Sequence, residues 1–265
     1  MKYFIVTDVH SFFCEMRAAL DAVGFDPENP EHIFVSLGDL LDRGPDPWQC
    51  LNYVMNTLAP ERRILICGNH EDLIEDIMCR RYFVSIDASN GTADTVYRLA
   101  KDEFRTNSDM ADIMTVHDMP LYNDYIKSLK NFHETQHGIF VHGWIPCIPH
   151  LKFSMYDGYQ KEYEPFASDW RTCDLETWKN ARWYNGMEAW DCGVREPSKT
   201  IFCGHWHTSW ARAAIDQTCD PYSNNKADYL PWERDGIVAL DACTAFTHFC
   251  NCYVFEDEPL EGENI

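Results

Sequence analysis

Three short polar clusters recur near the N-terminus, each directly after an apolar run. They are Asp8-Val9-His10, the stretch Gly38-Asp39-Leu40-Leu41-Asp42-Arg43-Gly44, and Gly68-Asn69-His70-Glu71. Asp39 lies at nearly equal sequence distances from Asp8 and from Asn69. Strands that alternate with helices at such a period predict a parallel α/β sheet. In such a sheet the loops after the strand carboxyl ends form the ligand crevice.

Helical patterns fill the spaces between these clusters. Ser11 can cap a helix whose apolar residues recur at helical spacing until Gly24. Pro45 and Pro47 open a second helix, and a third follows His70. The segment 1–80 is therefore expected to form three strand–helix units.

Two more strands are predicted to end in histidines. The apolar run 138–141 ends at His142, and the run 200–203 leads to His205 and His207. The runs 236–240 and 246–255 are predicted to be closing antiparallel strands.

We expect one domain over residues 1–265 with two insertions. Residues 84–135 carry few apolar side chains and many helix formers, which indicates a helical insertion. Residues 144–195 are rich in tryptophan and tyrosine, which indicates a cap-like insertion. Its aromatic residues can form a local core, a wall over the crevice, or both.

The composition limits the partners. The formal net charge of −21 disfavours polymeric nucleic acid and anionic membranes. No apolar run approaches the roughly 20 residues of a membrane span, and no signal peptide is apparent. The twelve cysteines are scattered without a Cys-x-x-Cys pair, which favours reduced thiols. A cytoplasmic location is expected.

The residues at the five strand ends are typical metal ligands. They are Asp8, His10, Asp39, Asn69, His142, His205 and His207. Mixed carboxylate, imidazole and amide ligands favour manganese, iron or zinc over calcium or magnesium. Seven ligands are too many for one tetrahedral ion but suit two neighbouring ions with a bridging carboxylate. Asp39, on the central strand of the first three, is the expected bridge.

These motifs, in this order, resemble the signature of the calcineurin-like metallophosphoesterases. The version Gly-Asp-Leu-Leu-Asp-Arg-Gly looks like the branch that contains bacterial and phage serine/threonine phosphatases and symmetrical dinucleoside tetraphosphatases. The resemblance covers residues 3–80, 126–146 and 200–245. It implies a four-layer α/β/β/α sandwich of two mixed sheets and two divalent metal ions, manganese first, with iron or zinc as alternatives.

The resemblance also implies roles for individual residues. Asp8, His10 and His207 would hold the first metal, Asp39 would bridge, and Asn69, His142 and His205 would hold the second. A metal-bound hydroxide would attack phosphorus in line. His70 would protonate the leaving oxygen, Asp42 would orient His70, and Arg43 would clamp the phosphate.

Two positions bear on substrate binding. The branch usually supplies a second phosphate-binding arginine, for which the candidates are Arg171, Arg182 and Arg195. Arg182 is preferred, because aromatic residues flank it. Trp144 stands where bacterial relatives have glycine, which would place an indole beside the second metal.

The expected function is hydrolysis of phosphomonoesters, including phosphoserine or phosphothreonine. Two alternatives stay open. One is symmetrical hydrolysis of dinucleoside polyphosphates. The other is a non-catalytic metal-binding scaffold, which is disfavoured because metal binding alone does not require Asp42, Arg43 and His70.

Overall fold

The architecture was analysed in a computed structural model that describes residues 1–102, 107–154, 158–218 and 227–260. The first of its two main sheets contains the three strands predicted near the N-terminus. Its order is β11 (Tyr253–Glu256), β1 (Lys2–Val6), β2 (His32–Ser36) and β3 (Arg63–Leu65). The strands β1, β2 and β3 are parallel, and β11 pairs antiparallel with β1.

The second sheet has five strands. Their order is β4 (His133–Glu134), β5 (Gly138–Phe140), β8 (Thr200–Cys203), β10 (Ile237–Ala239) and β9 (Trp232–Arg234). The central strands β5, β8 and β10 are parallel, and the two edge strands are antiparallel to them. The predicted closing strands were thus partly wrong. β10 runs parallel to β8, and the predicted strand from 246 begins within a short helix, α11 (Thr244–Thr247).

The two sheets pack face to face through alternate residues of their strands. In β1, Tyr3 and Ile5 face the second sheet, whereas Phe4 and Val6 join the core under the helices. In β5, Phe140 faces the first sheet and Ile139 faces the other way. Successive side chains of a strand point to opposite faces, so both sheets are apolar on both sides and need a cover on each.

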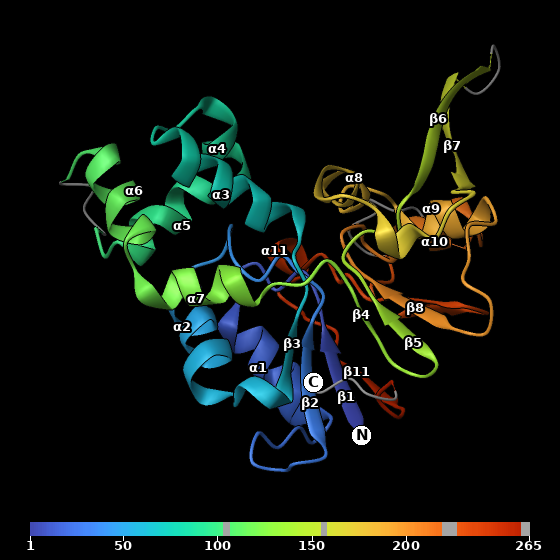
Figure 1. Cartoon of the computed structure of the whole chain (residues 1–265), viewed down its shortest axis with the longest axis horizontal. Coiled ribbons are helices and arrows are strands. Elements are labelled where there is room, and N and C mark those ends of the chain that lie inside the picture. The colour runs from blue at the N-terminus through green and yellow to red at the C-terminus, as the bar shows by residue number, and fades with distance from the viewer. Residues whose placement is uncertain (103–106, 155–157, 219–226, 261–265) are drawn as a thin grey trace.

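Helices supply the two outer layers (Figure 1). The core over the first sheet is formed with α1 (Phe13–Ala22), α2 (Pro47–Asn52, continued by a π-helical turn to Thr57), α3 (Asn69–Arg80), α5 (Thr92–Leu99), α6 (Asp109–His117) and α7 (Pro120–Ser128). The short helix α4 (Ser85–Asn90) packs against α5. The second sheet is covered by α8 (Leu175–Ala181), α9 (Gly186–Asp191) and α10 (Ser209–Ala214). The expected four-layer arrangement of two mixed sheets is confirmed.

The described parts of the two predicted insertions differ in structure. Helices α4 to α7 lie within 84–135. Residues 144–195 include a hairpin of β6 (Cys147–Ser154) and β7 (Gly158–Pro165), which extends away from the body (Figure 1). Trp144, Trp170 and Trp178 of this region are buried in the core beside the second sheet. The division into one domain with two insertions stays a prediction.

No helix among the described residues combines the length and apolar character of a membrane-spanning segment.

Candidate metal centre

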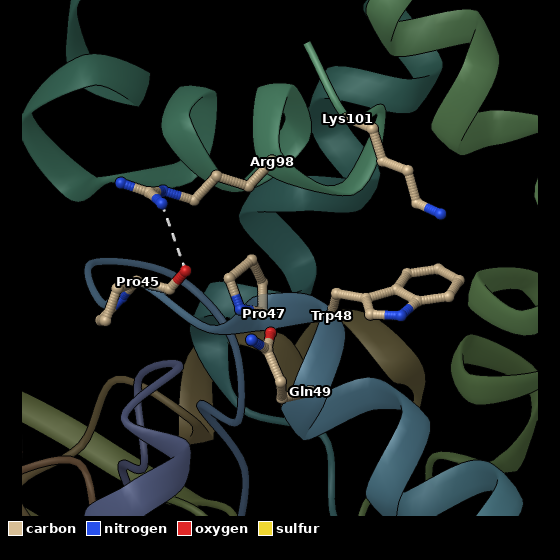
Figure 2. Close-up of a pocket in the computed structure, with 6 residues that line it drawn as sticks. All are labelled: Pro45, Pro47, Trp48, Gln49, Arg98 and Lys101. Atoms are coloured by element: carbon tan, nitrogen blue, oxygen red, sulfur yellow. Dashed lines mark hydrogen bonds between the residues drawn. The ribbon is translucent and has the colours of Figure 1, made fainter. Parts of the chain in front are cut away.

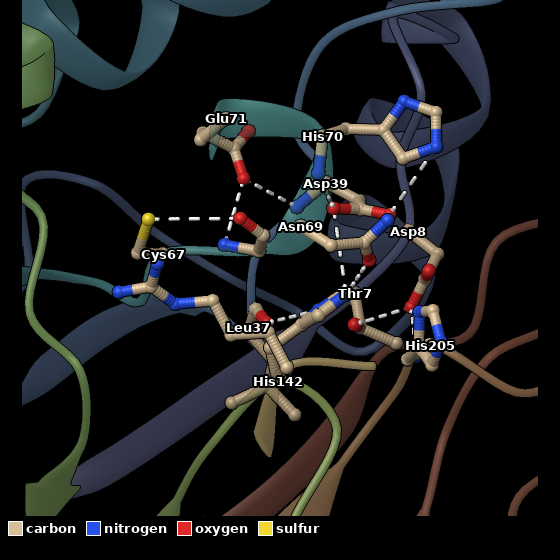
Figure 3. Close-up of polar contacts among 12 residues, drawn as sticks. Thr7, Asp8, Leu37, Asp39, Cys67, Asn69, His70, Glu71, His142 and His205 are labelled. Atoms are coloured by element: carbon tan, nitrogen blue, oxygen red, sulfur yellow. Dashed lines mark hydrogen bonds and ion pairs between the residues drawn. The ribbon is translucent and has the colours of Figure 1, made fainter. Parts of the chain in front are cut away.

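The carboxyl ends of five strands bring the predicted ligands together. Asp8 and His10 follow β1, Asp39 follows β2, Asn69 follows β3, His142 follows β5, and His205 follows β8. Figure 3 shows that Asp8, Asp39, Asn69, His142 and His205 converge from these separate strands. The shared pocket is about 100 Å³. Its walls are Asp8, His10, Asp39, Arg43, Asn69, His70, Asn90, Trp183, His205, Asp241, Cys243 and Ala245.

Asp39 belongs to two groups of metal-type ligand atoms. In one it lies with His10 and His70, and in the other with His142 and His205. Within each group the ligand atoms are within 4.8 Å of one another. One oxygen of Asp39 is 3.4 Å from His142 Nε2, and the other is 3.8 Å from His10 Nε2. This arrangement supports the expectation that Asp39 bridges two ions.

The backbone around the pocket is unusual. Asp8, His10, Asp39, Asp42 and His205 all adopt positive φ, between 48° and 75°. Such angles are uncommon for residues with a side chain and persist where the surrounding structure enforces them. Their concentration around one pocket indicates a functional site.

Two glycines let the loops approach closely. A Cβ on Gly68 would lie 2.2 Å from Asp39 Oδ1, and one on Gly204 would lie 2.3 Å from Asp8 Oδ2. Both distances are far below contact distance. The glycines in Gly-Asn-His-Glu and Gly-His-x-His are therefore required by the packing of the two carboxylates.

The histidines are prepared to act as neutral ligands. Burial lowers the pKa of His10 well below its usual value and lowers the pKa of His205 to about 3. His10 Nδ1 is 3.2 Å from the carbonyl of Leu41, and His142 Nδ1 is 2.8 Å from that of Leu37. When each Nδ1 donates to its carbonyl, Nε2 directs a lone pair into the site, as a metal ligand requires.

The donor set fits divalent cations. His142 Nε2 lies 2.8 Å from Asn69 Oδ1. In a neutral His142 that donates from Nδ1 to Leu37, Nε2 is an acceptor facing the Asn69 oxygen, and a cation bound by both atoms removes their repulsion. Asp8 and Asp39 are buried as well. Buried carboxylates at one site are stable only when paired or bound to metal.

The predicted catalytic residues lie beside the ligands. His70 Nδ1 donates to Asp42 Oδ2 over 2.7 Å, and two guanidinium nitrogens of Arg43 lie 3.0 Å from the Nε2 atoms of His70 and His10. Burial tends to lower the pKa of His70, but Asp39 and the hydrogen bond to Asp42 outweigh it, so that the pKa is raised. Asp42 also accepts a hydrogen bond from Thr92 at the start of α5.

The structure does not bring His207 to the ligand groups. His207 Nδ1 is 2.7 Å from Ser209 Oγ, and His207 is absent from the residues that line the described pocket. Trp144 also lies elsewhere: its indole is buried and donates to the carbonyl of Val194. The expected indole beside the second metal is therefore wrong, because the aromatic core takes up this side chain.

The arginine candidates are all engaged outside the pocket. Arg182, the preferred one, is buried and donates to both carboxylate oxygens of Asp72 and to Asn131. Arg171 binds Glu134, Asp169 and Glu196. Arg195 lies over the Trp190 ring. The described residues that line the pocket include one arginine, which is Arg43 and none of the three candidates.

Several residues of the site were missed by sequence reasoning. Asp241 and Trp183 line the pocket, and Asn90 reaches it from α4. Asp241 carries the same signal as the other ligands, since it comes just after the apolar run that includes β10. No comparable sequence signal marks Trp183 or Asn90, because the insertions that carry them lack a strand-end pattern.

Size does not single out this pocket. A cavity of about 290 Å³ lies between Pro45, Pro47, Trp48, Gln49, Arg98 and Lys101 (Figure 2). These lining residues include no carboxylate, imidazole or thiol, so this cavity lacks metal-ligand chemistry. The smaller pocket at the strand ends holds the ligands and is the better candidate for a catalytic site.

Comparisons with known proteins point the same way. A family model described as calcineurin-like phosphoesterase matches residues 1–209. A symmetrical bis(5'-nucleosyl)-tetraphosphatase from Pectobacterium carotovorum is 38% identical over 71 residues, which are 27% of this chain and 24% of that protein. Serine/threonine-protein phosphatase 1 from Salmonella typhimurium is 36% identical over 72 residues, which are 27% of this chain and 31% of that protein. The matched segment is thus less than a third of either relative.

A solved structure of a cold-active protein tyrosine phosphatase has a similar fold. It superposes with a TM-score of 0.53 over 96% of this chain and 73% of that chain, at 13% identity. At this identity the similarity concerns the fold alone.

Proposed function

Because the chain belongs to the calcineurin-like phosphoesterase family, we propose that it is a metal-dependent phosphoesterase that hydrolyses phosphomonoesters, including phosphoserine or phosphothreonine. The observation that carries this proposal is that His70 contacts both Asp42 and Arg43, and that this row of three side chains lies beside two groups of metal ligands that share Asp39. Metal binding alone does not need this row, which argues against a non-catalytic scaffold.

Two divalent cations fit the donor set. Asp8 and His10 would hold one, Asn69, His142 and His205 would hold the other, and Asp39 would contact both. We propose manganese, with iron or zinc as alternatives, because the ligands mix imidazole with oxygen donors. When bound, the cations supply positive charge to the phosphoryl group and lower the pKa of an attacking water.

The protein's own residues would complete the reaction. Arg43 is exposed, and its guanidinium contacts His10 and His70 at the mouth of the site, where it can bind two phosphate oxygens. His70 would give a proton from Nε2 to the leaving oxygen, because Asp42 holds Nδ1 and fixes the ring. The raised pKa of His70 favours its protonated form, which a proton donor needs.

The size of the pocket fits a phosphoryl group. Its volume of about 100 Å³ is well below the roughly 300–1,000 Å³ of pockets that enclose a whole drug-sized ligand. The rest of any substrate must therefore lie at the rim. Asn90, Trp183 and Ala245 line the pocket outside the ligand groups.

One observation favours the second candidate, hydrolysis of dinucleoside polyphosphates. Trp183 is 48% exposed and lines the pocket, with its ring edge-on to His205 at 5.6 Å between centroids. An exposed indole next to a phosphoryl site can stack a nucleobase, which is worth about 1–3 kcal/mol per base in single-stranded nucleic-acid complexes. The name of the Pectobacterium relative agrees with this candidate.

Steady-state kinetics with Mn²⁺ separate the candidates. We expect hydrolysis of p-nitrophenyl phosphate and phosphopeptides, with a kcat/KM that Trp183→Ala changes less than threefold. A dinucleoside polyphosphatase would instead prefer diadenosine tetraphosphate and lose about tenfold or more on Trp183→Ala. Tyr82→Ala is the matched control, since Tyr82 is 58% exposed and follows the far end of α3. Absence of activity with any divalent metal would support the scaffold.

The substrate is thus proposed to be a phosphorylated protein or small phosphoester, without polymeric nucleic acid or membrane as partner. The cytoplasmic location stays a prediction.

A further inference from the structure

The corner between α4 and α5 brings three successive residues to the site. Asn90 lines the metal pocket. Gly91 has a positive φ of 82°, and a Cβ on it would lie 2.6 Å from the backbone nitrogen of Arg43. Thr92 is buried, and its hydroxyl donates a hydrogen bond to Asp42 Oδ2 over 2.9 Å. This corner of the helical insertion therefore packs directly on the loop that carries Asp42 and Arg43.

Helix capping does not explain the hydroxyl of Thr92. Threonine is favoured as an N-cap because its side-chain oxygen accepts hydrogen bonds from backbone N–H groups of the first turn. The N-cap of α5 is Gly91, and Thr92 is the next residue, the first of the helix. Its hydroxyl instead donates to a carboxylate 50 residues earlier in the chain.

The Asp42 carboxylate is held through one oxygen. Asp42 is fully buried, and its Oδ2 accepts hydrogen bonds from Thr92 Oγ1 and from His70 Nδ1. The other oxygen, Oδ1, has no hydrogen-bond partner in the described part of the chain. Rotation of an aspartate carboxylate about its bond to Cβ is only weakly restricted by its own torsional preference. The hydroxyl of Thr92 is therefore the second contact that fixes which oxygen faces His70.

His70 is the group that this orientation serves. Its Nδ1 is held by Asp42, and its Nε2 lies 3.0 Å from a guanidinium nitrogen of Arg43 at the mouth of the site. Proton transfer from Nε2 needs an exact position, and a misplacement of about 1 Å can cost about 10²-fold in rate. The contacts from Thr92 through Asp42 to His70 thus connect the insertion to the proton donor.

We propose that Thr92 is a positioning residue for the proton donor His70 and that it acts through Asp42. This inference rests on the proposed function and gives the helical insertion a part in the reaction. In that step a water oxygen forms a bond to phosphorus while the bond from phosphorus to the leaving oxygen breaks. The leaving oxygen keeps the electron pair and takes the proton from His70 Nε2. Thr92 is absent from the residues that line the described pocket and keeps its own proton.

Two phosphomonoesters with the same ring but different leaving groups test the proposal in the presence of Mn²⁺. Phenoxide leaves poorly and needs a proton, whereas 2,4-dinitrophenolate leaves readily without one. Thr92→Val keeps the shape of the side chain and removes the hydroxyl. We expect it to lower kcat for phenyl phosphate about tenfold, because complete loss of a general acid costs about 10²- to 10⁴-fold. For 2,4-dinitrophenyl phosphate we expect the kcat of the wild type, and for both substrates an unchanged KM.

Thr95→Val is the matched control. Thr95 lies one turn later in α5 and is also buried, and its hydroxyl has no hydrogen-bond partner among the described residues. This variant should keep the wild-type kcat for both substrates. Thr92→Ser restores a hydroxyl and should recover most of the activity on phenyl phosphate. In a His70→Asn background, Thr92→Val should add no further loss, since residues that act as a unit are not additive.

Three kinetic results would overturn the assignment. They are equal losses of Thr92→Val on the two substrates, a further loss in the His70→Asn background, and a Thr92→Ser variant as slow as Thr92→Val. A crystal structure of the wild type with vanadate does not depend on a variant's folding: Thr92 Oγ1 beyond hydrogen-bond distance of Asp42 refutes the proposal.

The wild type separates this inference from the proposed function. If it hydrolyses both phosphomonoesters while one of those results holds, the inference alone fails. If it hydrolyses neither substrate with any divalent metal, the proposed function fails and the role of Thr92 fails with it.

Discussion

The Glu71→Gln substitution tests how the bridging loop is held. Glu71 is 1% exposed, and its carboxylate accepts four hydrogen bonds. Oε2 takes the backbone N–H groups of Asp39 and Gly68 over 2.9 and 2.8 Å, and Oε1 takes Leu40 N–H and the Tyr125 hydroxyl, both over 3.0 Å. One side chain therefore fixes the loops after β2 and β3, including the positive φ of 52° at Asp39.

The cost of the substitution follows from these contacts. Glutamine has the same shape, but its NH₂ group must replace one oxygen. The less harmful choice is the Oε1 position, where the Tyr125 hydroxyl can turn to become an acceptor. Leu40 N–H then faces a donor, and a buried unsatisfied N–H costs about 1–3 kcal/mol. The remaining bonds lose their charge assistance, so we expect a total loss of about 2–4 kcal/mol.

Urea unfolding of the metal-free protein measures this loss, because chelation removes the contribution of bound ions. Glu75→Gln is the matched control: Glu75 lies one turn later in α3 and accepts a hydrogen bond from one tyrosine hydroxyl, that of Tyr122, over 2.7 Å. We expect the control to cost about 1 kcal/mol or less. Equal unfolding midpoints for the two variants, at equal slope, would refute the reasoning.

Three further predictions concern catalysis, metal and pH. His70→Asn should lower kcat about 10²-fold or more and keep both metals; loss of an ion, measured by elemental analysis, would instead make His70 a ligand, which its place near His10 and Asp39 allows. Chelation should lower the melting temperature, and Mn²⁺ at about 100 times its Kd should restore about 2.7 kcal/mol; the same melts should show no response in Asp39→Asn. Burial lowers the pKa of His133 to about 4, so its neutral form is favoured in the folded state and stability falls as pH drops below the unfolded value of about 6.5. Urea unfolding should show that wild type loses about 2 kcal/mol more than His133→Leu between pH 8 and pH 5; parallel losses would contradict this origin.

The strand ends were the part of the site that local sequence could predict. Asp8, Asp39, Asn69, His142 and His205 each follow an apolar run, and parallel strands bring such positions to one edge. The two-sheet fold is confirmed by the alternating faces of β1 and β5. Asp241 obeys the same rule and could have been found, had the strand at Ile237–Ala239 been given its parallel direction.

Other features depended on contacts between distant segments. Arg182 has the residue type and the aromatic neighbours of a phosphate clamp, but Asp72, far earlier in the sequence, and Asn131 hold its guanidinium. His207 has ligand chemistry but turns toward Ser209. Trp183 reaches the pocket while Trp144 is buried, although both belong to the same aromatic region.

The sequence by itself determined which chemistry is available and at which strand ends, because an apolar run followed by a ligand is a local pattern. The tertiary structure decided which side chains face the pocket. That choice depends on which buried carboxylate, carbonyl or ring each side chain meets across the fold, and no local pattern contains this information.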